Sequence, residues 1–110
     1  MATNDGPLGT FEEQVLLAVI RSGEAAYGMQ VRREIERVTG RDVAIGAVYA
    51  TLDRLEAKGL IASRRSTVEG TVRRVFGVTR PGAAALAESR AMRERLWQGV
   101  ELGSLLGSGG

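Results

Sequence analysis

The side chains in this sequence that are best suited to chemistry are arginines gathered in one short stretch. Residues 63–80 contain five arginines and one acid, Glu69, a net charge of +4, whereas the whole chain carries only +2. A guanidinium group fits the oxygens of a phosphate. This stretch therefore predicts binding to a polyanion such as the DNA backbone. Its arginines are Arg64, Arg65, Arg73, Arg74 and Arg80.

Composition excludes several other kinds of site. The sequence contains no cysteine and no histidine, so it lacks thiol nucleophiles, disulfides, the commonest transition-metal ligands and the commonest general base. Its acids lie beside arginines and form no convincing acid–base pair. We therefore expect a binding protein rather than an enzyme, with no metal and no cofactor. The acids concerned are Glu34, Glu36, Asp42, Asp53 and Glu56.

No stretch of the sequence is suited to a membrane. The longest apolar run, residues 15–20, has six residues, whereas a membrane-spanning helix needs roughly 20. The first nine residues show no basic region followed by an apolar stretch, so we expect no secretory signal. The sequence predicts a cytoplasmic protein without a membrane partner.

The elements that position the arginines begin with three short helices. Thr10 and Glu13 have the spacing of a capping box, which predicts a helix that starts at Thr10 and stops near Gly23. Apolar spacing predicts a second helix over 28–38 and a third over 45–58. In the third helix the buried positions are Val48, Leu52 and Leu55. After it, Gly59 suits a left-handed helix end that lets Leu60 pack back on Leu55.

The pattern changes after the third helix. Residues 60–65 and 72–78 are short, apolar and rich in β-branched residues, and 66–71 contain a glycine, so we expect a β-hairpin. Thr79 can cap a last helix that runs from about residue 80 to 100 or slightly beyond.

This order of elements predicts a winged helix-turn-helix, in which a helix enters the major groove and a hairpin wing contacts the backbone. The expected fold class is mainly α with a small β-hairpin (α+β). We expect a flexible lead-in over 1–9 and a DNA-binding domain over 10–79. A C-terminal dimerisation helix over 80–102 and a flexible tail over 103–110 complete the chain.

The outer face of the third helix carries small side chains, which would let its backbone approach DNA closely. A solvent-facing helix would have the same pattern, and arginines can simply protect an exposed hairpin from aggregation. Arg65 is expected opposite Arg73 or Arg74, where like charges are unfavourable unless an anion lies between them. We therefore favour phosphate contact. The candidate DNA-binding residues are Gly46, Ala47, Tyr49, Ala50, Arg54, Arg64, Arg65, Arg73 and Arg74.

Three stretches together resemble the PadR family of bacterial transcriptional regulators: Tyr27-Gly28, GAVYATLDRLEAKGLI over 46–61, and RRVFGVTRPG over 73–82. The resemblance covers about residues 8–86. Ala47 replaces the usual Ser or Thr of the family, which removes a hydroxyl that could bind a phosphate. Thr71-Val72 replaces a frequent Arg-Pro, which leaves the wing tip less charged and less rigid.

The resemblance implies a homodimer that represses by occupying a palindromic operator in double-stranded DNA. The chain resembles the short members, in which one C-terminal helix dimerises and some proteins hold planar compounds between aromatic side chains. By the same likeness Tyr49 is expected to contact a phosphate or to pack, with contact favoured. Glu56 is expected to pair with a wing arginine, and Tyr27 and Phe76 to lie in the core.

The last helix independently predicts a dimer, because it has too many large apolar residues for a terminal helix that nothing covers. The expected interface residues are Leu86, Met92, Leu96, Trp97 and Val100. A gap between two Trp97 rings would admit a small aromatic effector; otherwise Trp97 is a plain interface residue.

Two other classes of protein compete with this interpretation. Regulators of the MarR type have an N-terminal dimerisation helix, for which nine residues leave no room. A winged helix can also serve purely as a protein-interaction or assembly module. Salt-sensitive binding to DNA-cellulose or heparin discriminates the module from a DNA-binding protein.

Overall fold

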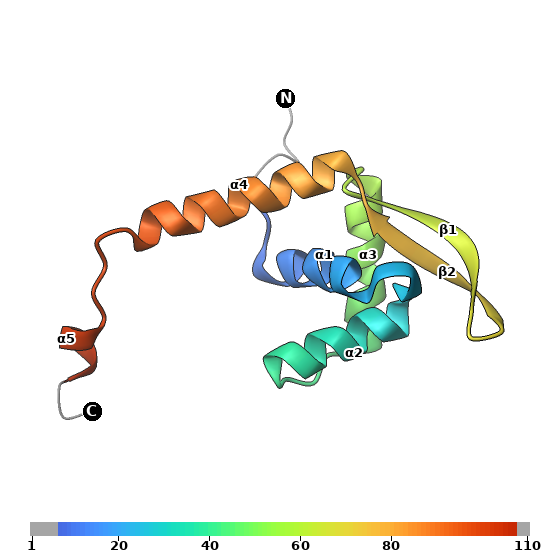
Figure 1. Ribbon diagram of the computed structural model, residues 1–110, viewed down its shortest axis with the longest axis horizontal. Helices are drawn as coiled ribbons and strands as arrows, with labels where there is room; N and C mark the ends of the chain where they lie inside the picture. Colours follow the sequence, from blue (N-terminus) through green and yellow to red (C-terminus); the bar gives the residue numbers. More distant parts are fainter. Residues whose placement is uncertain (1–6, 108–110) are drawn as a thin grey trace.

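The fold consists of a small helical body with a hairpin on one side and a long helix on the other (Figure 1). The computed structural model describes residues 7–107. The elements in chain order are α1 (Thr10–Ser22), the 3-10 helix η2 (Gly23–Ala25), α2 (Gly28–Thr39), α3 (Ile45–Ala57), β1 (Ile61–Val68), β2 (Thr71–Val78), α4 (Arg80–Trp97) and α5 (Gly103–Leu106). The mainly helical fold class with one small hairpin is confirmed.

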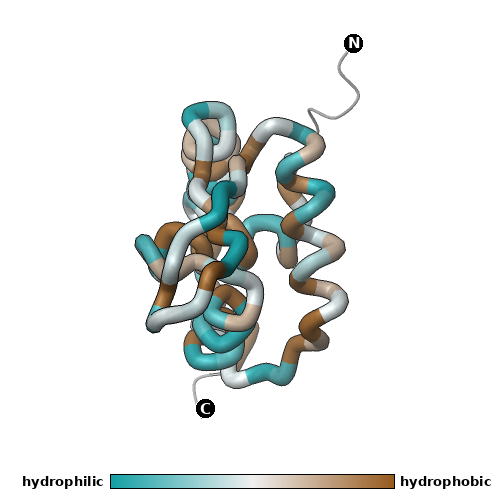
Figure 2. Tube along the Cα trace, turned by 90° about the vertical axis from the view of Figure 1, so that its right-hand side faces the viewer, coloured by the Kyte–Doolittle hydropathy of each residue, from teal (hydrophilic) through white to brown (hydrophobic). Residues whose placement is uncertain are grey.

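The core lies where the first three helices meet the base of the hairpin. Val48, Leu52 and Leu55 of α3 are fully buried, as their spacing predicts, and they pack with α1, α2, Ile61 and Phe76. Apolar and polar segments alternate along the helices in Figure 2, as expected for helices with one buried side. Tyr27 and Phe76 are only 6% and 4% exposed, so their predicted place in the core is confirmed.

The start of α1 differs from the predicted capping box. Gly9, not Thr10, is the residue before the helix, and the carboxylate of Glu12 accepts a hydrogen bond from the Gly9 N–H at 3.0 Å. Thr10 is already helical. The prediction that Thr10 caps the helix with Glu13 is wrong because the glutamate one residue earlier takes the capping position.

The end of α3 confirms the predicted left-handed turn. Gly59 has a φ of +78°, and its N–H donates to the carbonyl of Glu56, while the N–H of Leu60 donates to the carbonyl of Leu55. These two bonds are a Schellman ending. The end of α2 is less regular than its apolar spacing suggests, since Val38 is 56% exposed.

The hairpin is longer than predicted. β1 and β2 have eight residues each, and the turn consists only of Glu69 and Gly70, both with positive φ. The expected turn over 66–71 is wrong because its two threonines and Val68 favour strand and a two-residue turn of this type matches strand twist. Arg65 lies directly opposite Arg74.

An isolated β-bridge joins the hairpin to the entry of α2. Tyr27 forms a bridge with Val75, and the N–H of Phe76 donates to the carbonyl of Ala26 at 2.9 Å. No pattern in the sequence indicates this pairing. It attaches β2 to the start of α2.

The junction between the hairpin and α4 is tightly built. The Thr79 hydroxyl accepts from the N–H of Gly82 and donates to the carbonyl of Gly59 at 2.7 Å, so its predicted capping role is confirmed. A Cβ on Gly82 would overlap the carbonyl oxygen of Leu60. Glycine is therefore required where α4 crosses the end of α3.

The far end of α4 extends away from the body (Figure 1). The helix ends at Trp97 rather than near residue 100, because no other element among residues 7–107 packs there to sustain it. Val100 therefore follows the helix, and the four-residue helix α5 lies in the predicted tail. None of the helices in the described part of the chain is long and apolar enough to cross a membrane.

Candidate nucleic-acid interface

The exposed side of α3 is small-sided at its start, as its sequence predicts. Gly46, Ala47 and Ala50 are exposed while Val48 and Leu52 behind them are buried. The backbone of α3 can therefore approach a ligand closely at these three positions, as a helix in the major groove must.

Tyr49 is a large residue near the start of α3, and it lies against the start of α2. Its side chain is 40% exposed, and a Cβ on Gly28 would overlap its ring and hydroxyl oxygen. The Tyr-Gly pair at 27–28 thus has a physical basis, which is that Gly28 makes room for Tyr49. Packing is established for the ring, while the exposed part keeps phosphate contact a prediction.

The wing arginine Arg74 is held by α3. It pairs with Asp53 at 3.4 Å and with Glu56, and it donates to the hydroxyl of Ser63. The hydrogen bond from the Ser63 hydroxyl, followed by Arg74, holds the pKa of Glu56 below its usual value against desolvation. The predicted pairing of Glu56 with a wing arginine is confirmed, and part of the counter-charge expected from an outside anion comes from α3 itself.

Another predicted contact residue, Arg54, forms an ion pair within the protein. Arg54 pairs with Glu12 of α1 at 3.3 Å, so it leans toward α1, where Lys58 meets the same carboxylate at 2.9 Å. Desolvation raises the pKa of Glu12, but the Gly9 N–H and these two cations outweigh it and hold that pKa below its usual value.

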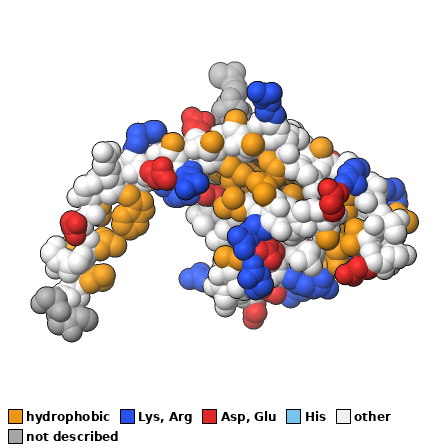
Figure 3. All heavy atoms as spheres, viewed as in Figure 1, with side chains coloured by type: hydrophobic (Ala, Val, Ile, Leu, Met, Phe, Trp, Pro, Cys, Tyr) orange, Lys and Arg blue, Asp and Glu red, His pale blue; other side chains and the backbone are white. Residues whose placement is uncertain are grey.

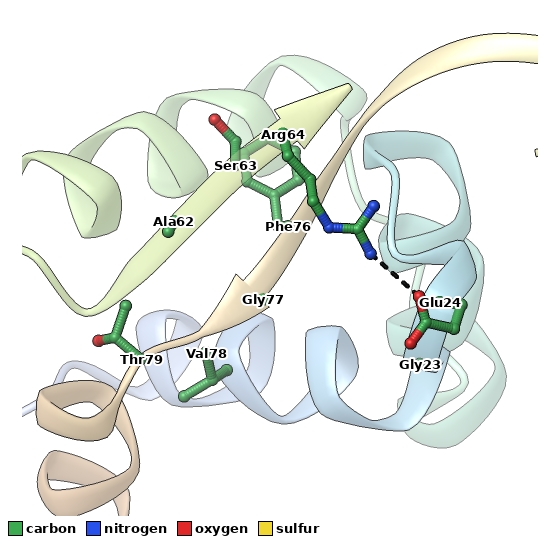
Figure 4. A pocket seen from close by; sticks show the side chains of 9 residues that line it. All are labelled: Gly23, Glu24, Ala62, Ser63, Arg64, Phe76, Gly77, Val78 and Thr79. Atoms are coloured by element: carbon green, nitrogen blue, oxygen red, sulfur yellow. Dashed lines mark hydrogen bonds and ion pairs between the residues drawn. The ribbon is translucent and has the colours of Figure 1, made fainter. Parts of the chain in front are cut away.

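Arg64, on the other face of the hairpin from Arg74, pairs with Glu24 at 3.0 Å. This pair borders a hollow of about 330 Å³ between η2 and the base of the hairpin (Figure 4). Its only charged lining residues are these two. Both are already paired, so we do not assign the hollow a ligand.

Arg65 and Arg73 are different, because neither forms an ion pair with any residue among 7–107. Arg73 stacks on the ring of Tyr27, with its guanidinium carbon 4.2 Å from the ring centroid. Arg33 of α2, which the sequence analysis missed, donates to the hydroxyl of the same tyrosine at 3.1 Å. Its position six residues after Tyr27 was the available signal.

The expected interface residues of α4 divide into two groups. Leu86 and Met92 are half-buried, whereas Leu96, Trp97 and Val100 are 72%, 57% and 48% exposed. Apolar side chains gather along the inner side of this projecting arm and beneath α4 where it crosses the body (Figure 3). A groove of about 600 Å³ follows α4, with Ala84, Ala85 and Met92 in its lining.

Comparison with known proteins places this geometry in a family. Residues 16–88 match the model of the transcriptional regulator PadR-like family. Transcriptional regulator Rv3488 of Mycobacterium tuberculosis is 43% identical over 70 residues, which are 64% of this chain. The match spans 64% of that relative's length as well.

Solved structures agree with the fold. The PadR family transcriptional regulator from Eggerthella lenta superposes with a TM-score of 0.63 at 28% identity, covering 84% of this chain and 80% of that one. RosR of H. salinarum superposes with a TM-score of 0.66 at 25% identity, covering 92% of this chain and 84% of that one.

Proposed function

Since this chain belongs to the PadR-like family of transcriptional regulators, we propose that it binds operator DNA through α3 and the wing. The observation that carries the proposal is that α3 begins with small exposed residues, while the wing holds two arginines, Arg65 and Arg73, without an ion-pair partner among residues 7–107. The first two turns of α3 lie in the major groove, and the arginines meet the phosphates beside it.

The proposed contact residues differ in their roles. Gly46, Ala47 and Ala50 allow close approach, Tyr49 offers its hydroxyl to a phosphate, and Arg65 and Arg73 neutralise backbone charge. The other three arginines mainly stabilise the interface, because each forms an ion pair with an acidic side chain of the protein. They are Arg54, Arg64 and Arg74.

We further propose that the protein is a homodimer that represses transcription by occupying a palindromic operator. The support is the exposed apolar surface of α4, with Leu96 and Trp97 at its far end and Val100 just beyond. A second copy would cover this surface, and two-fold symmetry would present two α3 helices to two half-sites. The domain boundary near residue 79 follows, with the DNA-binding part before it and the dimerisation part after it.

The dimer also offers a place for an effector. Trp97 is the only tryptophan of the chain and more than half exposed, so a flat aromatic compound can stack on it where the two copies meet. Binding there would shift the spacing of the two α3 helices and release the DNA. Quenching of Trp97 fluorescence by such a compound tests this part of the proposal.

Fluorescence anisotropy on the DNA upstream of the protein's own gene tests DNA binding. Arg65→Gln with Arg73→Gln should weaken binding to every sequence and lower the slope of log K against log salt by roughly 1.8, about 0.9 for each phosphate contact. Arg90→Gln is the matched control, because it removes a charge from α4, away from the wing.

An unchanged slope in the double variant would remove these arginines from the interface. Wild-type protein that binds no DNA while remaining a dimer would favour the assembly-module alternative. If DNA binding holds, the protein acts where the DNA is, which in a cell without a nucleus is the cytoplasm.

A further inference from the structure

Tyr27 supports two arginines that come from different elements. Arg73 of β2 stacks on its ring at 4.2 Å, and Arg33 of α2 donates to its hydroxyl at 3.1 Å. The tyrosine itself is held firmly, since it is 6% exposed and bridges to Val75. One buried ring thus fixes two guanidinium groups that are 40 residues apart in sequence.

These two positive charges lack compensation within the described part of the chain. Neither arginine makes an ion pair there, and besides Tyr27 the one side chain that accepts from Arg33 is the neutral Gln30, at 3.4 Å. The Nε of Arg73 is buried without any hydrogen-bond partner. A buried donor left unpaired is costly, and two neighbouring cations repel. The repulsion between the two cations falls when an anion binds between them.

The pair lies next to the exposed side of α3. Tyr27 directly precedes Gly28, and the ring of Tyr49 packs against Gly28. An anion held by Arg33 and Arg73 would therefore lie beside the proposed groove-binding helix, where a DNA backbone passes.

We propose that Arg33 and Arg73 form a clamp for one DNA phosphate, with Tyr27 as the positioning residue that aims both guanidinium groups. The proposal rests on DNA binding by α3 and the wing, and adds to it a contact from α2. The phosphodiester oxygens would accept from N–H groups of both guanidinium groups.

Three variants of the full-length protein test the clamp by anisotropy on operator DNA over a range of salt. Arg33→Gln should weaken binding about 10-fold, and it should lower the salt slope by less than the roughly 0.9 of a whole phosphate contact, because Arg73 still neutralises the shared phosphate. Arg33→Lys keeps the positive charge but loses the planar guanidinium and its paired N–H donors. It should therefore leave the salt slope unchanged and weaken binding. Tyr27→Phe keeps the ring under Arg73 but removes the acceptor for Arg33, so it should weaken binding several-fold without changing the slope.

The double variant shows whether Tyr27 affects DNA binding by positioning Arg33 or only by supporting the fold. In the Arg33→Gln background, Tyr27→Phe should not weaken DNA binding further, because the guanidinium group that the Tyr27 hydroxyl positions is already absent. The matched control is Arg37→Gln, which removes the same charge one turn further along α2 from an arginine already paired with Glu34 and should leave binding unchanged. Thermal melting of each variant reports whether it is folded, and if Arg33→Gln fails to fold, Arg33→Lys and Tyr27→Phe decide.

The outcomes distinguish the clamp from the function on which it rests. Wild-type binding with Arg33→Gln equal to Arg37→Gln overturns the clamp alone. Additive losses in the double variant overturn the role of Tyr27. Wild-type protein that binds no DNA overturns the proposed function and the clamp together.

Discussion

At the scale of single residues, the interface depends on close contacts that leave no space for a larger side chain. Gly28 and Gly82 each lie where an added Cβ would overlap another part of the chain, the Tyr49 ring and the Leu60 carbonyl respectively. Gly46 has open space around its Cα. These three glycines thus differ in whether the structure has room for an added methyl group.

Gly28→Ala should destabilise the protein by about 1–3 kcal/mol, because the methyl group must displace Tyr49 or shift α2. Gly46→Ala is its matched control and should stabilise by about 0.5–1 kcal/mol, since nothing lies within 4 Å of the new methyl. Urea unfolding measures both. Equal effects of the two substitutions would show that Tyr49 does not rest on Gly28.

At the scale of elements, acidic side chains join helices to one another and to the wing. Glu12 joins α1 to α3 through Arg54 and Lys58, and Glu34 joins α2 to α1 through Arg21 at 2.6 Å. Asp53 and Glu56 join α3 to the wing through Arg74. The hairpin is therefore oriented relative to α3 by charge as well as by its apolar base.

Glu34 should make stability dependent on acid pH. Hydrogen bonds from Arg37 and then Arg21 lower its pKa from 4.5 to about 2. A pKa that is lower in the folded state adds stability above pH 4.5, and this contribution is lost as pH falls from 4.5 to about 2. The melting temperature of Glu34→Gln should therefore lie below that of wild type at pH 7, and the difference should shrink toward pH 2.

Glu24→Gln is the control for this titration, because that carboxylate is 95% exposed and pairs only with Arg64. It should change the melting temperature little at any pH. A difference between wild type and Glu34→Gln that stays constant from pH 7 to pH 2 would contradict the assignment.

At the scale of the whole molecule, the arm formed by the end of α4 and the residues after it has no neighbour in a single described chain. Leu96, Leu105 and Leu106 are 72%, 80% and 76% exposed. We expect a second copy to cover this apolar surface, as the proposed homodimer on a two-fold operator requires.

Sedimentation should therefore find wild-type protein at twice the chain mass at micromolar concentration and a chain truncated after Arg90 at the monomer mass. Leu96→Arg should have the effect of truncation, because it places a charge in an apolar interface. Val72→Arg is the matched control, since Val72 is also largely exposed, at 61%, but lies near the wing tip. A truncated chain that keeps the dimer mass would refute an interface formed by the end of α4.

Local patterns in the sequence determined the elements and most of the core. The apolar spacing of α3, the glycine at its end and the Thr79 cap each act within a few residues of chain, so all three were predictable. The family motif identified α3 and the wing in the same way. Element ends were predicted less well, because Gly9 and Glu12 competed with an equally plausible cap one residue later.

Tertiary structure alone decided which wing arginines form ion pairs within the protein and which can still bind an outside anion. Arg73 and Arg74 are adjacent and chemically identical, and the sequence assigned both to DNA. Because alternate strand residues face opposite sides, Arg74 meets the acids of α3 whereas Arg73 lies on Tyr27 beside Arg33. These partners come from elements far apart in sequence, so their positions depend on how the helices and the hairpin pack, which no local pattern encodes.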